Sequence, residues 1–299
     1  MVHDIIHDGS LRVAATKPGT HQVLWNVRGG YLLQDWLQRT QRSRLVFAGG
    51  GGHAGERRLL DSSPMMMSAA VSPGRTRVAW ASGRNELTTP TLVSVAVPAT
   101  GRIVASRSFR WARVLGVTRS RVLLTRRDAS SPATTVWWNF RQHRVTRIAA
   151  REAARADLAR SRIVIAAGQF DEPAFCNRVA PLSHPHRTLW RSCRWAPHAW
   201  SPDGARVVAT HTYFDDVGTD RWLTMKADTG RRLGVFTGWD AVWEDDAHVL
   251  TLAQGDSGQA AIIRCTVAGQ CERASRLQDM GKVTYQPNYI SPPVVLAAN

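Results

Sequence analysis

Short apolar runs alternate with polar, turn-forming residues along the whole chain. The clearest example is Trp200–Ala209, in which the turn Ser201–Gly204 separates two apolar stretches and Arg206 opens the second one. Short runs bounded by Gly, Pro, Asp and Ser predict β-strands, because an amphipathic helix would instead show an apolar stripe with helical periodicity. The positions equivalent to Arg206 in the other segments are Tyr31, Arg77, Arg121, Arg162 and His248. The chain is therefore a series of repeats, spaced by 46, 44, 41, 44 and 42 residues.

Each repeat divides into four strands at its turns. In the clearest repeat we predict strands at residues 197–200, 206–212, 221–227 and 231–236. Tight turns at Ser201–Gly204 and Asp228–Gly230 join the first strand to the second and the third to the fourth, because Pro and Gly suit these turn positions. A four-stranded unit of this period is typical of a β-propeller blade. We therefore predict an all-β fold with negligible helix, namely a six-bladed β-propeller of four-stranded antiparallel sheets, with seven blades as the alternative.

The length and the chain ends predict a single domain over residues 1–299. A closed all-β ring of 299 residues is a common size for one domain, and a hydrophobic fraction of 43% is enough to build a core. Residues 1–20 and 278–299 lie outside the six turns and contain further strand-like runs. We expect one end to complete a blade begun by the other, so that the termini close the ring and remove exposed strand edges.

The chain is strongly basic, with a formal net charge of +16. Such a charge can favour nucleic acid or other polyanions. All but three of the 39 basic residues are arginine, and they are spread over all the repeats without a motif for DNA or RNA binding. Aromatic residues do not alternate with them as a stacking platform requires. We therefore do not expect specific nucleic-acid binding.

The four cysteines form two local pairs. Cys265 and Cys271 flank a predicted hairpin turn at Gly269, so their sulfurs are expected on facing strand positions, and Cys176 and Cys193 lie within one repeat. Two disulfides indicate an oxidising compartment. The alternative for the second pair is a zinc site that adds the histidines of His184-Pro185-His186, although this spacing matches no usual finger.

The disulfides predict an extracytoplasmic protein, secreted or in the cell envelope. The first residues, Met1–Asp8, show no basic region followed by an apolar one, as a signal peptide would, and no apolar run is long enough for a transmembrane helix. The expectation is therefore that a leader or anchor was removed from this sequence, or that the assigned start lies downstream of the true one.

The run Trp-Ser-Pro-Asp-Gly-x-Arg-Val-Val-Ala at Trp200–Ala209 resembles the repeat of the TolB-type, WD40-like propellers of bacterial envelope proteins. Ser72–Trp80 shows a weaker version of the same run, and the remaining repeats share its period. The resemblance implies a propeller fold in which the Asp-Gly turns are structural, and it carries over no catalytic residue. It also implies a role as an interaction scaffold or as an accessory domain of a larger enzyme.

Few residues form a chemical constellation. Gly255-Asp256-Ser257-Gly258 matches a serine-protease nucleophile motif, but without a partner histidine in a matching context it is better interpreted as a turn. Asp215, Asp216 and Asp220 share one loop, but their spacing is not that of a calcium loop. We therefore predict no catalytic site, no metal site and no cofactor.

Two function classes remain. The first is a binding or scaffold module, a monomer that presents loops to a protein or a small-molecule ligand, and the alternative is a hydrolase or lyase acting on carbohydrate or peptide. Tight turns are expected on one face and the longer connections on the other, where specificity usually lies. The predicted binding residues lie in these longer connections or, for Arg110, Trp111 and Trp239, in links between blades: Arg84, Arg110, Trp111, Arg127, Asp171, Glu172, Asp215, Asp216, Trp239 and Asp256.

Overall fold

The structure is a computed structural model of the 299-residue chain. It describes residues 5–8, 11–14, 20–37, 40, 42–50, 56–64, 66–83, 89–128, 131–167, 176–212, 220–255, 259–279, 285–286, 289–290 and 296–298. By contacts the chain divides into two compact units. The first, here the N-terminal unit, comprises Asp4–Ile165 and Ala180–Arg187, and the other, here the C-terminal unit, includes Ala166–Val179 and Thr188–Asn299.

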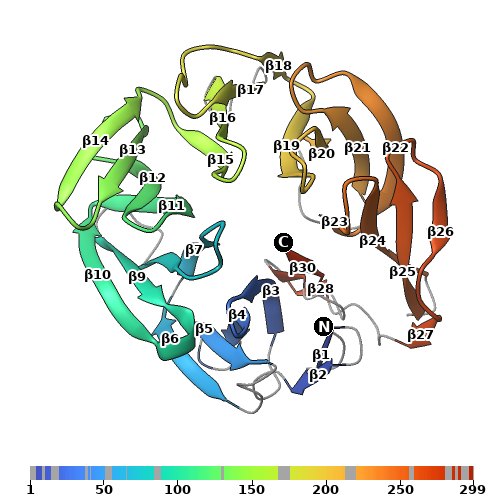
Figure 1. Ribbon diagram of the computed structural model, residues 1–299, viewed down its shortest axis with the longest axis horizontal. Helices are drawn as coiled ribbons and strands as arrows, with labels where there is room; N and C mark the ends of the chain where they lie inside the picture. The colour runs from blue at the N-terminus through green and yellow to red at the C-terminus, as the bar shows by residue number, and fades with distance from the viewer. Residues whose placement is uncertain are drawn as a thin grey trace. The chain divides into compact units, whose positions relative to one another are not determined.

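Three complete blades belong to the N-terminal unit (Figure 1). Blade I consists of β3 (Thr20–Val27), β4 (Gly30–Leu37), β5 (Arg42–Gly49) and β6 (Arg57–Ser63). Blade II consists of β7 (Met66–Val71), β8 (Val78–Ser82), β9 (Thr91–Val97) and β10 (Arg102–Phe109). Blade III consists of β11 (Trp111–Val117), β12 (Arg121–Arg127), β13 (Thr134–Asn139) and β14 (Arg144–Ala149). Each blade is an antiparallel sheet in chain order.

Blade IV consists of β15 (Ala153–Asp157), β16 (Arg162–Ala167), β17 (Cys176–Pro181) and β18 (Trp190–Ser192). Blades V and VI belong to the C-terminal unit. Blade V consists of β19 (Trp195–Trp200), β20 (Arg206–His211), β21 (Asp220–Lys226) and β22 (Arg232–Gly238). Blade VI consists of β23 (Ala241–Trp243), β24 (His248–Gln254), β25 (Gln259–Thr266) and β26 (Cys271–Arg273), and β27 (Gln278–Asp279) also pairs with β25.

The remaining described strands are short and lie toward the chain ends. They are β1 (Ile5–Asp8), β2 (Leu11–Ala14), β28 (Tyr285–Gln286), β29 (Tyr289–Ile290) and β30 (Ala297–Ala298). Helix in the described residues is limited to one 3-10 turn, Pro98–Thr100. Six four-stranded antiparallel blades confirm the predicted six-bladed β-propeller fold, and the alternative of seven blades is wrong. Closure of the ring by the termini stays a prediction.

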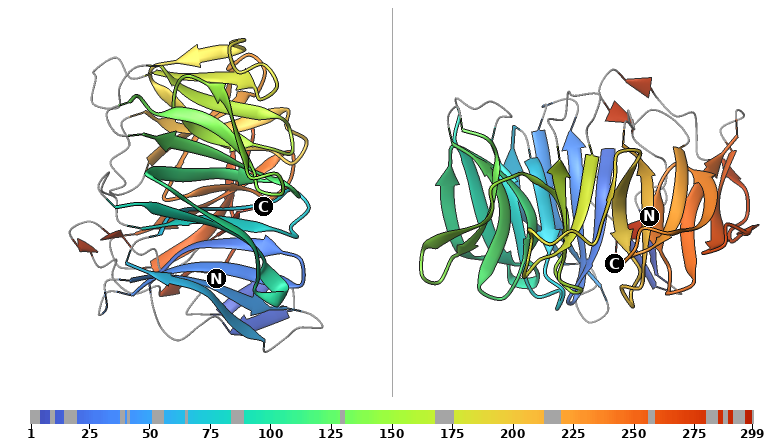
Figure 2. Two further views of the ribbon diagram at one scale, coloured as in Figure 1. Left: turned by 90° about the vertical axis from the view of Figure 1, so that its left-hand side faces the viewer. Right: turned by 90° about the horizontal axis from the view of Figure 1, so that it is seen from above.

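The core of each unit lies between the faces of neighbouring blades. In the N-terminal unit, Trp138 of β13 packs edge-on against Phe109 of β10, with ring centroids 5.9 Å apart. In the C-terminal unit, Trp243 of β23 is 4% exposed and donates a hydrogen bond from Nε1 to the Ala199 carbonyl oxygen of β19 at 3.0 Å. The strand axes of blades I to III are roughly aligned in Figure 2, as expected for sheets that pack face to face. Burying large side chains between sheets fixes each blade against the next.

Each blade has two different ends. At one end, here the turn end, lie the connections from the first strand to the second and from the third strand to the fourth. At the opposite end, here the loop end, lie the connection between the second and third strands and the link to the next blade. In blades II, III and V the turn-end connections are tight turns and the connection between the second and third strands is the longer one. In blade V, Ser201–Gly204 and Asp228–Gly230 lie at the turn end, and β19 and β21 begin at the loop end.

Candidate functional site

The turn ends are built for structure, because side-chain oxygens close the turns between first and second strands. In blade V, Ser201 Oγ accepts a hydrogen bond from the Arg206 amide at 3.0 Å, and in blade II Ser72 Oγ accepts one from the Arg77 amide at 3.1 Å. Thr118 and Asp245 accept from the Arg121 and His248 amides in blades III and VI, and Asp157 of blade IV accepts from the Arg160 amide. Such bonds satisfy turn amides that would otherwise lack partners. The polar residue before the Arg206-like position in blades II, III, V and VI is therefore a structural feature.

Neighbouring turns of blades V and VI also bind each other. The Asp203 amide donates to Asp246 Oδ1 at 2.7 Å, and the Arg206 guanidinium donates to the Asp246 carbonyl oxygen at 2.9 Å. The same guanidinium lies 3.1 Å from Asp203 Oδ2. These contacts explain the Asp-Gly-x-Arg sequence as a link between two blades, in agreement with the structural role that the TolB resemblance implies.

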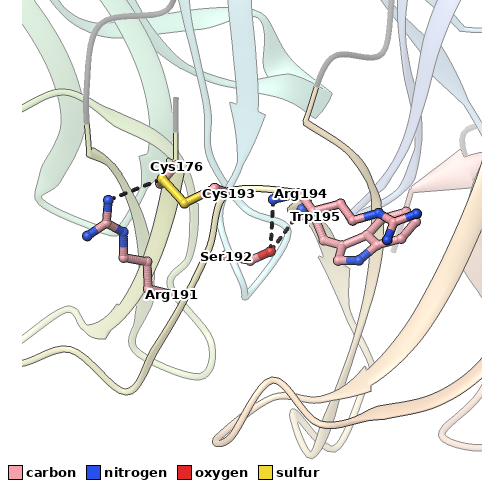
Figure 3. The surroundings of a disulfide bond; sticks show 6 residues. All are labelled: Cys176, Arg191, Ser192, Cys193, Arg194 and Trp195. Carbon is pink, nitrogen blue, oxygen red and sulfur yellow. Dashed lines mark hydrogen bonds between the residues drawn. A yellow bond between two sulfur atoms is a disulfide. The ribbon is translucent and has the colours of Figure 1, made fainter. Parts of the chain in front are cut away.

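Both predicted disulfides are present. Cys265 and Cys271 are facing residues of β25 and β26, and Cys176 of β17 is bonded to Cys193 just after β18 (Figure 3). The zinc interpretation is wrong, because its two cysteine ligands, Cys176 and Cys193, are bonded to each other. Arg191 donates to the sulfur of Cys176 at 3.1 Å, so the bridge lies in a basic environment.

The loop end of blade III brings together three of the predicted binding residues. Trp111 is the first residue of β11 and faces Arg127, the last residue of β12. The Arg127 guanidinium carbon lies 6.0 Å from the centroid of the Trp111 ring, at the outer limit of a cation–π contact. Arg110 precedes Trp111 and is exposed. The structure thus groups Arg110, Trp111 and Arg127, and it places Trp111 on a strand rather than in a link between blades.

The loop end of blade V repeats this arrangement with residues that are not among the predicted binding residues. Trp195 opens β19 and faces His211 at the end of β20, with ring centroids 5.5 Å apart. The Arg194 guanidinium carbon lies 5.3 Å from the Trp195 ring. Ser192 Oγ accepts the amide hydrogens of Arg194 at 3.2 Å and Trp195 at 2.9 Å. Figure 3 shows Ser192, Arg194 and Trp195 beside the disulfide, so Cys193 fixes the segment that carries them.

A groove runs along the face of blade V from this point, with a volume of 320 Å³. Its lining residues are Arg194, Trp195, Arg221, Leu223, Met225, Gly230 and Arg232. Leu223 and Met225 are 2% and 5% exposed and form an apolar floor. None of the lining residues is acidic, and three are arginine. The groove therefore combines an apolar floor with positive charge.

Trp239 is held within blade VI. It packs against a cluster that includes Leu252 and Leu296, and its amide donates to the Leu252 carbonyl oxygen at 2.9 Å. Its half-buried position between β22 and β23 gives it a packing role. The remaining predicted binding residues lie outside the described residues: Arg84, Asp171, Glu172, Asp215, Asp216 and Asp256.

One group of acid–base side chains gathers at the turn end of blade VI. Ligand atoms of Glu244, Asp245 and His248 lie within 4.8 Å of one another. Both carboxylate oxygens of Glu244 accept hydrogen bonds from Arg264 at 2.6 Å, and this pairing raises the pKa of Arg264. The hydrogen bond from His248, together with that from the Ala247 amide, holds the pKa of Asp245 below its usual value. Glu244 thus serves an ion pair with Arg264, and Asp245 serves to close the turn.

A repeated tripeptide in the sequence identifies Arg194 and Trp195. Arg110-Trp111-Ala112 and Arg194-Trp195-Ala196 are the same tripeptide, and each opens the first strand of a blade. Comparing repeats before the turn, as well as after it, finds Arg194 and Trp195. The other two arginines of the groove, Arg221 and Arg232, have no such signal, because they reach the site only through strand register.

A scan against protein-family models gives no match, and a search of curated proteins finds none. Several solved structures are similar in fold. The uncharacterized protein lmo1340 from Listeria monocytogenes EGD-e has a TM-score of 0.54 at 9% identity, with 90% of this chain and 87% of that chain covered. TolB from Acinetobacter baumannii has a TM-score of 0.51 at 12% identity, with 87% of this chain and 65% of that chain covered.

The β-propeller domain of the Trilobed protease from Pyrococcus furiosus has a TM-score of 0.54 at 10% identity, with 87% of this chain and 86% of that chain covered. Identities this low establish the fold alone. The chain therefore has the six-bladed β-propeller fold, similar to that of TolB and of a protease propeller domain, as its repeats predict.

Proposed function

We propose that this protein is an exported binding module that recognises a protein or small-molecule partner through the loop ends of its blades. The observation that carries the proposal is the repeated Arg–Trp pair, which opens the first strand of blade III at Arg110-Trp111 and of blade V at Arg194-Trp195. Each indole lies against a basic or aromatic partner on the neighbouring strand, Arg127 or His211.

The chemistry of these pairs suits recognition. Tryptophan and arginine are the residues most enriched at the energetic centres of protein interfaces, because they combine large contact area with hydrogen-bonding capacity. Placing them at strand ends rather than within loops holds them rigid, so little conformational entropy is lost on binding. The turn ends, in contrast, use their polar groups to bind one another.

The two disulfides support a location outside the cytoplasm, because reducing compartments keep most thiols free. No helix in the described part of the chain is long and apolar enough to cross a membrane. An enzyme of the hydrolase or lyase type finds less support, since the grouped carboxylates Glu244 and Asp245 already serve an ion pair and a turn.

Affinity capture from a cell-envelope extract of the source organism tests the proposal. The bait is the oxidised protein, the loop-end variant Arg110→Ser with Arg127→Ser, or the turn-end variant Arg141→Ser with Arg144→Ser. Both variants remove two positive charges from blade III, so they are matched in net charge. We expect partners that the wild type retains to be lost from the loop-end variant and kept by the turn-end variant. Equal retention by both variants, each with an unchanged melting temperature, contradicts the proposal.

A further inference from the structure

We propose that the groove of blade V binds a small organic dianion with an apolar body, its two acidic groups held at opposite ends of the groove. This inference rests on the proposed function, because the groove begins at the loop end of blade V, and it names a ligand class for that module. The observations that support it are the placement of the arginines, the register of the strands and the character of the floor.

Strand register places positive charge at both ends of the groove. Trp195, which follows Arg194, faces His211 on β20 at the loop end. Arg232 faces Met225 on β21, and Met225 in turn faces Val207 on β20. His211 and Val207 are four residues apart, which corresponds to about 13 Å along a strand. Arg194 and Arg232 therefore mark the two ends of an extended site.

Side-chain alternation puts the lining residues on one face of the sheet. Arg221, Leu223 and Met225 are alternate residues of β21, so their side chains point to the same side. Arg232 lies on that side too, because directly opposite residues in an antiparallel pair share a face. The opposite face of β21 carries Trp222, which packs toward blade VI. One face of blade V thus packs toward blade VI, and the other carries the groove lining.

The contents of the groove define the ligand. Leu223 and Met225 offer an apolar floor and Trp195 an aromatic wall, which favour an aliphatic or aromatic body. Guanidinium groups bind carboxylate and phosphate through paired, charge-assisted hydrogen bonds. A volume of 320 Å³ lies at the small end of the range for small-molecule sites, which favours a compact molecule over a folded macromolecular partner.

The loop-end side of the groove is held in place by covalent and hydrogen bonds. Cys193 is tied to Cys176, and the next two amides donate to Ser192 Oγ (Figure 3). Arg194 and Trp195 are therefore held before any ligand arrives. Such preorganisation reduces the entropy lost on binding.

Isothermal titration calorimetry of the oxidised 299-residue chain at low salt tests the proposal, with nonanedioate as the probe and its monomethyl ester as a control of nearly equal length and half the charge. We expect nonanedioate to bind about tenfold more tightly than the ester, a difference of one charge-assisted contact. Arg232→Gln should abolish that difference. Arg231→Gln, which removes a neighbouring exposed charge outside the groove lining, should preserve it.

Three results would overturn the proposal: no measurable binding of nonanedioate, equal binding of diacid and ester, or equal effects of Arg232→Gln and Arg231→Gln. The last result would show attraction to net positive charge alone. Circular dichroism confirms that both variants are folded. Failure here leaves the capture experiment on blade III untouched, since Arg110 and Arg127 take no part in this groove, so the two proposals fail separately.

Discussion

Replacing Gly230 with alanine should destabilise the protein more than the same change at Gly101 or Gly74. Gly230 ends the turn between β21 and β22 with φ +68°, a left-handed conformation that alanine adopts at a cost of about 1–2 kcal/mol. A Cβ atom there would also lie 2.7 Å from Cδ2 of Trp190, an indole that is 8% exposed. Trp190 cannot retreat freely, because its Nε1 donates to the Ala227 carbonyl oxygen at 2.9 Å.

Forced repacking of this kind costs about 1–3 kcal/mol. Together with the backbone cost, Gly230→Ala should lower the free energy of unfolding by about 2–5 kcal/mol. Gly101 is the matched control, with φ +66° and only the flexible Arg58 side chain in the way, so Gly101→Ala should cost about 1–2 kcal/mol. At Gly74 a Cβ meets nothing within 4 Å, and Gly74→Ala should be neutral or stabilising.

Urea unfolding followed by tryptophan fluorescence measures all three variants under oxidising conditions. The expected order of stability is Gly74→Ala, then Gly101→Ala, then Gly230→Ala. A Gly230 variant as stable as the Gly101 variant would refute the close packing of Trp190 on this turn, and with it the arrangement of β18 against blade V.

Three further predictions concern the crosslinks, the turns and the chain ends. Denatured, unreduced protein should show no thiol that reacts with a labelling reagent, and four reactive thiols would contradict both disulfides. Removing Cys176–Cys193 or Cys265–Cys271 should lower the free energy of unfolding by about 3 and about 2 kcal/mol, respectively. Asp245→Asn should lower the free energy of unfolding at neutral pH but not at a pH below the folded-state pKa of Asp245. The reason is that the ionised carboxylate stabilises the folded protein above its unfolded-state pKa, and this stabilisation is lost as pH falls through the lower folded-state pKa. An equal loss at all pH values in urea titrations would contradict this prediction. If the termini close the ring, deleting residues 293–299 should lower the melting temperature measured by calorimetry, and an unchanged value would leave closure to other contacts.

The repeat pattern predicts most of the fold. The turn Ser201–Gly204 was predictable because Pro and Gly have strong backbone preferences, and the Cys265–Cys271 bridge because a short hairpin brings facing residues together. The predicted strands of blade V differ from the observed ones by two residues or fewer at each end. Local chemistry decides these features, so the sequence alone carries the information.

The candidate site was only partly predictable, because it depends on register and on neighbours distant in sequence. Arg110 and Trp111 were selected as residues of a link, but Trp111 lies on β11 and faces Arg127 through antiparallel pairing. The groove joins Arg194 to Arg232 across four strands, and no spacing rule in the sequence reports that approach. Trp239 illustrates the opposite error, since an aromatic residue beside a turn proved to be packed in blade VI.

Site-specific photo-crosslinking shows whether recognition lies at the loop ends of the blades. Benzoylphenylalanine replaces Arg110 at the loop end of blade III or Arg141 at its turn end, both exposed positions that flank strands of this blade. After irradiation of cells that produce each variant, we predict covalent adducts from position 110 and none from position 141. Adducts from position 141 alone, from both positions equally, or from neither would contradict the account.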